Sequence, residues 1–194
     1  MNFKKILIFF LNIPLFSKFV LGHQGHGMGG LIAGLTHPIF GSDHLLAMLS
    51  VGIISAQIGG YALWSVPLIF VLFMIVGGVM GLNFIPFIGV ELGIAISVII
   101  LGIAIFSEKK LSIIITSLFI AFFGIFHGYA HGMEVPQIAS PYLYVVGFIL
   151  TTIIIHLSGL YFGYWFTKKN ALNKTLRVCG LFIALIGILF LIKL

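Results

Sequence analysis

The chain has 194 residues, of which 61% are hydrophobic and only 7% are charged. A soluble domain carries about 25% charged residues, so this composition cannot cover a water-facing surface and lipid must solvate most of the exterior. The net charge of +6 does not indicate nucleic-acid binding, because the basic residues stand singly or in pairs at the ends of apolar runs. The composition therefore predicts an all-α integral membrane protein with no large soluble domain.

The N-terminus has the features of a secretory signal peptide. A basic pair, Lys4-Lys5, precedes an apolar stretch, 6–16, that is too short to span a membrane comfortably. Small or medium residues then lead up to a cleavage position after Gly22. We expect residues 1–22 to be a cleavable signal peptide and residues 23–194 to be the mature domain. The alternative is an uncleaved helical anchor.

Six apolar segments follow the signal peptide. They cover residues 29–58, 62–82, 86–106, 111–132, 142–166 and 175–193. We expect the first segment to be broken at His37-Pro38, because proline removes a backbone donor and frees carbonyls of the preceding turn. The predicted architecture is a compact bundle of about six transmembrane helices.

Glycines spaced by four residues recur within these segments. They are Gly30/Gly34, Gly77/Gly81, Gly124/Gly128/Gly132 and Gly159/Gly163. On a helix, such residues form one smooth row that allows the backbone of a neighbouring helix to approach closely. The sequence therefore predicts thin helices packed close together.

The charges of the predicted loops orient the bundle in the membrane. Basic residues occupy the connections after the third and fifth segments: Lys109, Lys110, Lys168, Lys169 and Lys174. The connections after the second and fourth segments contain neither lysine nor arginine. The positive-inside rule places the basic loops in the cytoplasm, and the signal peptide independently places the mature N-terminus outside. We expect a multi-pass protein of the bacterial inner (plasma) membrane.

Ionisable residues inside the apolar segments form two clusters. A charged group at the centre of the bilayer costs about 2.5–3.5 kcal/mol on insertion scales, so such residues are candidates for function. The first cluster contains His37, Asp43 and His44. Met48 follows one helical turn after His44. This segment offers two imidazoles, a carboxylate and a thioether near one point.

The second cluster lies at the end of the fourth apolar segment. His127 and His131 are an i,i+4 pair on one helix face, and Glu134 continues that face if the helix extends that far. Imidazoles with a few carboxylates suit nickel, cobalt, zinc or copper, and disfavour magnesium and calcium. A cysteine-based metal site is excluded because Cys179 is the only cysteine. The sequence leaves open whether the two clusters form one site or two successive stations.

Five further residues have two interpretations each. His156 is a helix-to-helix hydrogen-bonding group or a residue of the transport path, and Glu91 bonds to a histidine or carries a coupling proton. Met48 is a packing residue or an additional ligand. His23 and His26 belong to an unstructured leader or capture the metal ion outside the membrane.

The two clusters resemble those of the HupE/UreJ family, the hydrogenase/urease accessory membrane proteins that act as nickel and cobalt permeases. The likeness is carried by His37-Pro38-x-x-Gly41-x-Asp43-His44-x-x-x-Met48 and His127-Gly128-x-Ala130-His131-Gly132-x-Glu134-x-Pro136. The resemblance covers nearly the whole chain. It implies secondary transport of nickel or cobalt into the cytoplasm, with His37, Asp43 and His44 essential and the residues of the second cluster next.

The sequence thus predicts a permease for a divalent transition-metal ion rather than an enzyme. Ni²⁺ or Co²⁺ is the transported ligand, and no permanent cofactor is expected. The expected partners are the ion and the lipid bilayer, a homo-oligomer is left open, and nucleic acid is excluded. The alternatives are an intramembrane zinc-dependent hydrolase, although the chain lacks the HExxH motif, and a membrane metal-binding accessory protein that does not transport.

Overall fold

A computed structural model describes residues 29–107, 112–135, 140–168 and 173–194. Within these ranges every regular element is a helix. The predicted signal peptide, 1–22, and the candidate capture residues His23 and His26 lie outside the described residues.

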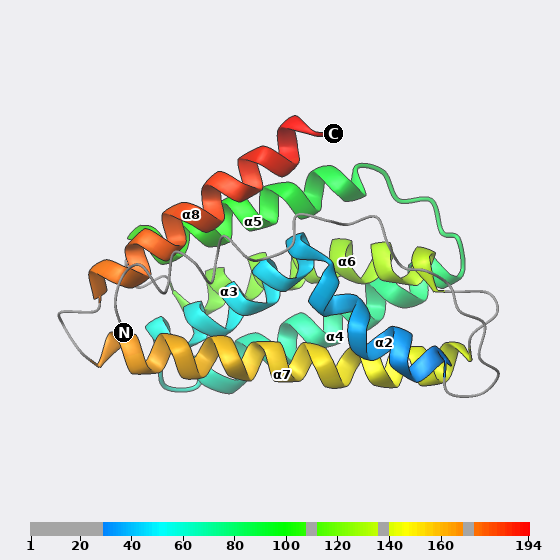
Figure 1. Cartoon of the computed structure of the whole chain (residues 1–194), viewed down its shortest axis with the longest axis horizontal. Coiled ribbons are helices and arrows are strands. Elements are labelled where there is room, and N and C mark those ends of the chain that lie inside the picture. The colour runs from blue at the N-terminus through cyan, green and yellow to red at the C-terminus, as the bar shows by residue number, and fades with distance from the viewer. Residues whose placement is uncertain (1–28, 108–111, 136–139, 169–172) are drawn as a thin grey trace.

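Seven helices are described. They are α2 (Gly29–Phe40), α3 (Ser42–Ile58), α4 (Ala62–Leu82), α5 (Val90–Ser107), α6 (Ile113–Glu134), α7 (Pro141–Thr167) and α8 (Asn173–Ile192) (Figure 1). By length and composition, the five helices α4 to α8 can each cross a membrane. Helices α2 and α3 pass the same test only as a pair, bent by 76° at their junction. The predicted all-helical membrane bundle is confirmed.

Helices α2 and α3 follow α7 in the same direction along its length (Figure 1). Gly34 of α2 lies against the backbone of Tyr144, near the beginning of α7. Further along, Gly52 of α3 lies against the backbone of His156, and Gly163 of α7 lies against Ile53. Because the pair advances with α7, it forms one broken span rather than a loop that returns to the same side. The described helices then make six spans.

The break in this span lies at Gly41, so the predicted position at His37-Pro38 is wrong. Helix α2 continues through Pro38 to Phe40, and the amide of Gly41 still donates to the carbonyl of His37 at 3.1 Å. Gly41 then adopts an extended conformation with φ −74° and ψ 97°, and its carbonyl accepts the first bond of α3, from Leu45. Glycine has little helix propensity, so the chain leaves the helix at this residue.

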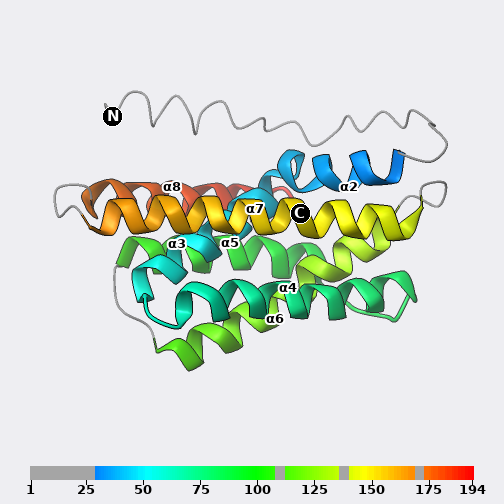
Figure 2. The same cartoon turned by 90° about the horizontal axis from the view of Figure 1, so that it is seen from below.

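Helices α4 and α6 form the most extensive helix pair, on the side of the bundle away from α2 (Figure 2). Gly77 of α4 lies against the backbone of Ile125, and Gly81 lies against that of Tyr129. From the other side, Gly128 lies against the backbone of Met74. The two helices therefore run parallel at a separation that leaves no room for side chains. The predicted close approach of glycine-lined helices is confirmed.

Adjacent glycines of α4 provide a matched test of this packing. A Cβ atom at Gly77 would overlap the carbonyl oxygen of Ile125, whereas one at Gly78 would lie 3.6 Å from the carbonyl oxygen of Gly128, an ordinary contact. Both alanine variants gain the same helix propensity, about 1 kcal/mol. We expect Gly77→Ala to lower the melting temperature in detergent, because overpacking costs about 1–3 kcal/mol, and Gly78→Ala to preserve or raise it. Equal melting temperatures for the two variants would contradict the packing described.

Candidate metal site

The two predicted clusters meet in one place, where the break between α2 and α3 faces the C-terminal part of α6. The ring centroids of His37 and His131 are 5.0 Å apart, and those of His44 and His131 are 4.1 Å apart. The His44 and His127 rings are also 5.0 Å apart. Four imidazoles from three helices therefore form a continuous group, which we call the histidine cluster.

Local structure explains how each imidazole reaches this position. His37 lies in the last turn of α2 and His44 in the first turn of α3, so the break at Gly41 allows one span to present both side chains. His127 and His131 are one turn apart on α6. Because glycines of α6 lie against α4, that helix closes tightly on α6 next to the histidines. His44, His127 and His131 are all buried.

Glu134 joins the histidine cluster at the end of α6. Its Oε2 atom lies 3.0 Å from Nε2 of His37 and 3.6 Å from Nδ1 of His131. One ligand atom from each of these three residues lies within 4.8 Å of the others. Two imidazole nitrogens and a carboxylate oxygen at this spacing can surround a single transition-metal ion with small adjustments. His37, His131 and Glu134 are therefore the most complete set of candidate ligands among the described residues.

Asp43 orients the His44 ring. The Nδ1 atom of His44 lies 2.9 Å from Oδ1 of Asp43. An ionised carboxylate only accepts hydrogen bonds, so Nδ1 carries the proton, and in the neutral ring Nε2 keeps its lone pair. That Nε2 atom is buried and has no hydrogen-bond partner in the described part of the chain. A carboxylate that fixes the imidazole in this way is typical of metal-binding histidines.

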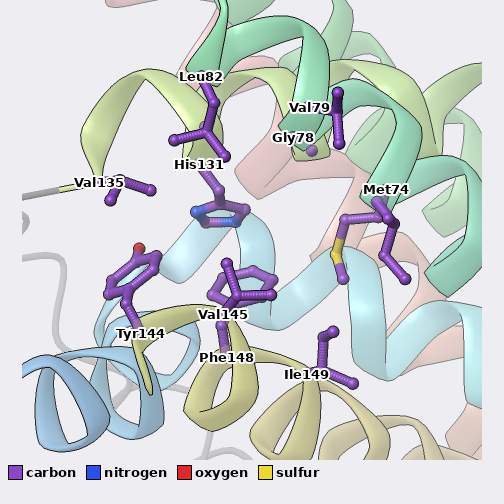
Figure 3. A pocket seen from close by; sticks show the side chains of 13 residues that line it. Met74, Gly78, Val79, Leu82, His131, Val135, Tyr144, Val145, Phe148 and Ile149 are labelled. Carbon is purple, nitrogen blue, oxygen red and sulfur yellow. The ribbon is translucent and has the colours of Figure 1, made fainter. Parts of the chain in front are cut away.

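The surroundings of the site are aromatic and apolar. The Phe148 ring lies 4.1 Å from that of His131, and the Tyr144 ring lies 6.0 Å from that of His37. Beside His131 there is a cavity of about 90 Å³ between α4, α6 and α7 (Figure 3). Figure 3 shows the imidazole of His131 next to Tyr144 and Leu82. These walls keep the His131 imidazole away from bulk water, where its attraction for a cation would be screened.

Sequence reasoning missed Tyr144 and Phe148 as neighbours of the site. They lie four residues apart at the beginning of α7, so they share one face of that helix. Nothing in the sequence distinguishes Phe148 from the other 19 phenylalanines of the chain. Only the packing of α7 against α2 brings these rings to the histidines.

The remaining candidates do not belong to the group formed by His37, His131 and Glu134. Met48, on α3, is fully buried in the hydrophobic core of the bundle. Glu91 is exposed in the first turn of α5 and makes no hydrogen bond or ion pair with any described residue. His156 is buried on α7, with the ring of Phe70 in contact with both its imidazole and that of His127.

The fold and this site define a multi-pass helical membrane protein with buried histidines between its spans and the carboxylates of Asp43 and Glu134 beside them. The chain matches the family described as HupE / UreJ protein over residues 11–190, and it belongs to that family. It is 39% identical over 138 residues to Protein HupE of Rhizobium leguminosarum bv. viciae, an alignment that covers 71% of this chain and 72% of that protein. No solved structure matches the chain.

Replacing Glu134 tests the ligand set directly. Glu134→Gln keeps the size of the side chain but removes the negative charge shared by His37 and His131. We expect the affinity of the purified protein for Ni²⁺, measured by isothermal titration calorimetry, to fall by about tenfold or more, because a neutral amide is a poor ligand for this ion. The neighbouring Met133→Leu variant, at an exposed position, is the control and should bind as the wild type does. Unchanged affinity in Glu134→Gln would remove this carboxylate from the site.

Proposed function

We propose that this protein is a secondary transporter that takes up a divalent transition-metal ion, Ni²⁺ or Co²⁺, into the cytoplasm. The observation that supports this proposal best is the convergence of four imidazoles and Glu134 within a helical membrane bundle. Ionisable residues inside membrane spans are costly and commonly mark the path of an ion. Imidazole with a few carboxylates is a ligand set for Ni²⁺, Co²⁺, Zn²⁺ or Cu²⁺ rather than for Mg²⁺ or Ca²⁺.

The exposure of the ligands supports a path rather than a closed structural site. The Glu134 side chain is 51% exposed, that of His37 is 25% exposed and that of His131 is 5% exposed. His127, one turn before His131 on α6, is fully buried. An ion that arrives at the end of α6 would therefore meet a carboxylate first and progressively more buried imidazoles afterwards. Mixed ligands of this kind hold an ion firmly enough to admit it and weakly enough to release it.

The proposed orientation places the histidine cluster on the outer side of the membrane. The cluster lies near Tyr144, at the beginning of α7, whereas Lys168 follows the other end of that helix. The positive-inside rule assigns the lysine end to the cytoplasm. His23 and His26, which lie outside the described residues, would then be on the outer side, where they could capture the ion.

The membrane potential is a sufficient driving force for this direction of transport. A single charge that crosses 100 mV gains about 2.3 kcal/mol, so a divalent cation gains about 4.6 kcal/mol. This corresponds to roughly three decades of concentration ratio. Inward movement of the ion therefore requires neither nucleotide hydrolysis nor an obligatory coupling ion.

Uptake of radioactive nickel and cobalt by metal-starved cells tests the proposed function. We expect cells that produce the wild type to accumulate one or both ions, and cells that produce His44→Ala at the same membrane abundance to lose at least about nine-tenths of that uptake. The loss would follow because His44 is in ring contact with both His127 and His131. Ser158→Ala is the control, since Ser158 is exposed on α7 and bonds only to its own helix, at the carbonyl of Ile154.

Absence of uptake with the wild type correctly inserted would contradict transport. The two alternative functions, a zinc-dependent hydrolase and an accessory protein that binds the metal without transporting it, would then be tested. A wild type that transports, together with a His44→Ala variant that transports equally well, would move the path away from the histidine cluster.

A further inference from the structure

His156 is a buried histidine whose environment is unusual for a packing residue. It lies near the middle of α7 and is 2% exposed. Its Nδ1 atom donates to the carbonyl oxygen of Thr152, one turn earlier, at 2.9 Å. Its Nε2 atom is buried and has no hydrogen-bond partner among the residues that the structure describes. A buried polar atom without a partner is costly, and this cost calls for an explanation.

Contact between α3 and α7 does not provide that explanation. At the level of His156, the two helices meet through their backbones, because Gly52 of α3 lies against the carbonyl of His156 and Gly159 of α7 lies against that of Leu49. The imidazole makes no hydrogen bond across this contact. A role for His156 in joining the two helices therefore leaves its Nε2 atom unexplained.

The same arrangement occurs at His127 in the histidine cluster. There, Nδ1 donates to the carbonyl oxygen of Phe123 at 3.0 Å, and Nε2 is buried without a partner in the described ranges. A carbonyl can only accept, so in both residues the proton is held on Nδ1 and the lone pair remains on Nε2. Metal-binding histidines are commonly fixed in this way, with the second ring nitrogen bonded to a backbone carbonyl.

The position of His156 continues the line of imidazoles toward the other end of the bundle. Phe148, in ring contact with His131, lies two turns earlier on α7, which corresponds to roughly 12 Å of helix. The Phe70 ring contacts both His127 of the histidine cluster and His156. Its centroid lies 5.5 Å from that of His127 and 5.2 Å from that of His156. Thr152 shares a helix face with His156, and its hydroxyl oxygen is also buried and unpartnered among the described residues.

We propose that His156 Nε2 and the Thr152 hydroxyl oxygen form a second binding station for the transition-metal ion, on the inward side of Phe70. The station receives the ion from His127 and passes it to the cytoplasmic end of the bundle. His37, His131 and Glu134 form the outer site. One imidazole and one neutral hydroxyl bind a divalent cation less tightly than this site, which includes a carboxylate, and the difference favours release of the ion. The inference rests on the proposed transport function.

Uptake and affinity measurements on His156→Leu separate a transport role from a role in the outer site. We expect nickel uptake to fall by about tenfold or more, while the Ni²⁺ affinity of the outer site in purified protein changes by less than about twofold. Ser158→Leu, two residues further along the same helix and exposed, is the matched control and should retain uptake. Uptake by His156→Leu at the wild-type rate would overturn the proposal and leave the transport function standing.

A cysteine at position 156 gives a spectroscopic signature that a packing role cannot produce. Cys179, the native cysteine, is buried on α8 and is first replaced by alanine. With Co²⁺ in excess of the outer site, His156→Cys should show thiolate-to-cobalt charge-transfer absorption, and Ser158→Cys should show none. Absence of this absorption in a folded protein that still binds Co²⁺ at the outer site would overturn the proposal. The result is independent of uptake, so it also tests the station if the wild type proves not to transport.

Discussion

The close approach of helix backbones at glycine is the constraint on which the rest of this structure depends. Lipid solvates apolar side chains as well as a neighbouring helix does, so spans associate by tight packing rather than by the hydrophobic effect. On α6, Gly128 lies between His127 and His131 in sequence and lies against α4. The contact that joins the two helices thus also fixes the histidines at the level where α2, α3 and α7 enclose them.

The break at Gly41 is the second feature that makes the site. An unbroken helix would carry His37 and His44 past α6 seven residues apart, roughly 10 Å along the axis. The 76° bend instead brings both rings to His131. Irregular backbone at membrane depth is tolerated where it is buried in protein or lines a cavity, and here Gly41 is half-buried beside the imidazole of His44.

The sequence predicted the features that depend on composition and spacing. Apolar runs of spanning length gave the six spans, and the cost of ionisable groups in lipid singled out both clusters. It failed where tertiary packing decides. The proline at position 38 suggested a break that the chain makes three residues later, at Gly41. Sequence alone could not show that the clusters meet, or that Tyr144 and Phe148 enclose them, because both depend on how α6 and α7 pack.

The proposed ion path requires α2 and α6 to contribute ligands to the same ion. Nickel K-edge X-ray absorption of the purified protein with one equivalent of Ni²⁺ tests it most directly. We expect scattering from more than one imidazole in the wild type, and a reduced imidazole contribution in both His37→Ala and His131→Ala at metal concentrations that keep the site filled. An unchanged spectrum in either variant would show that the two helices do not share the ion.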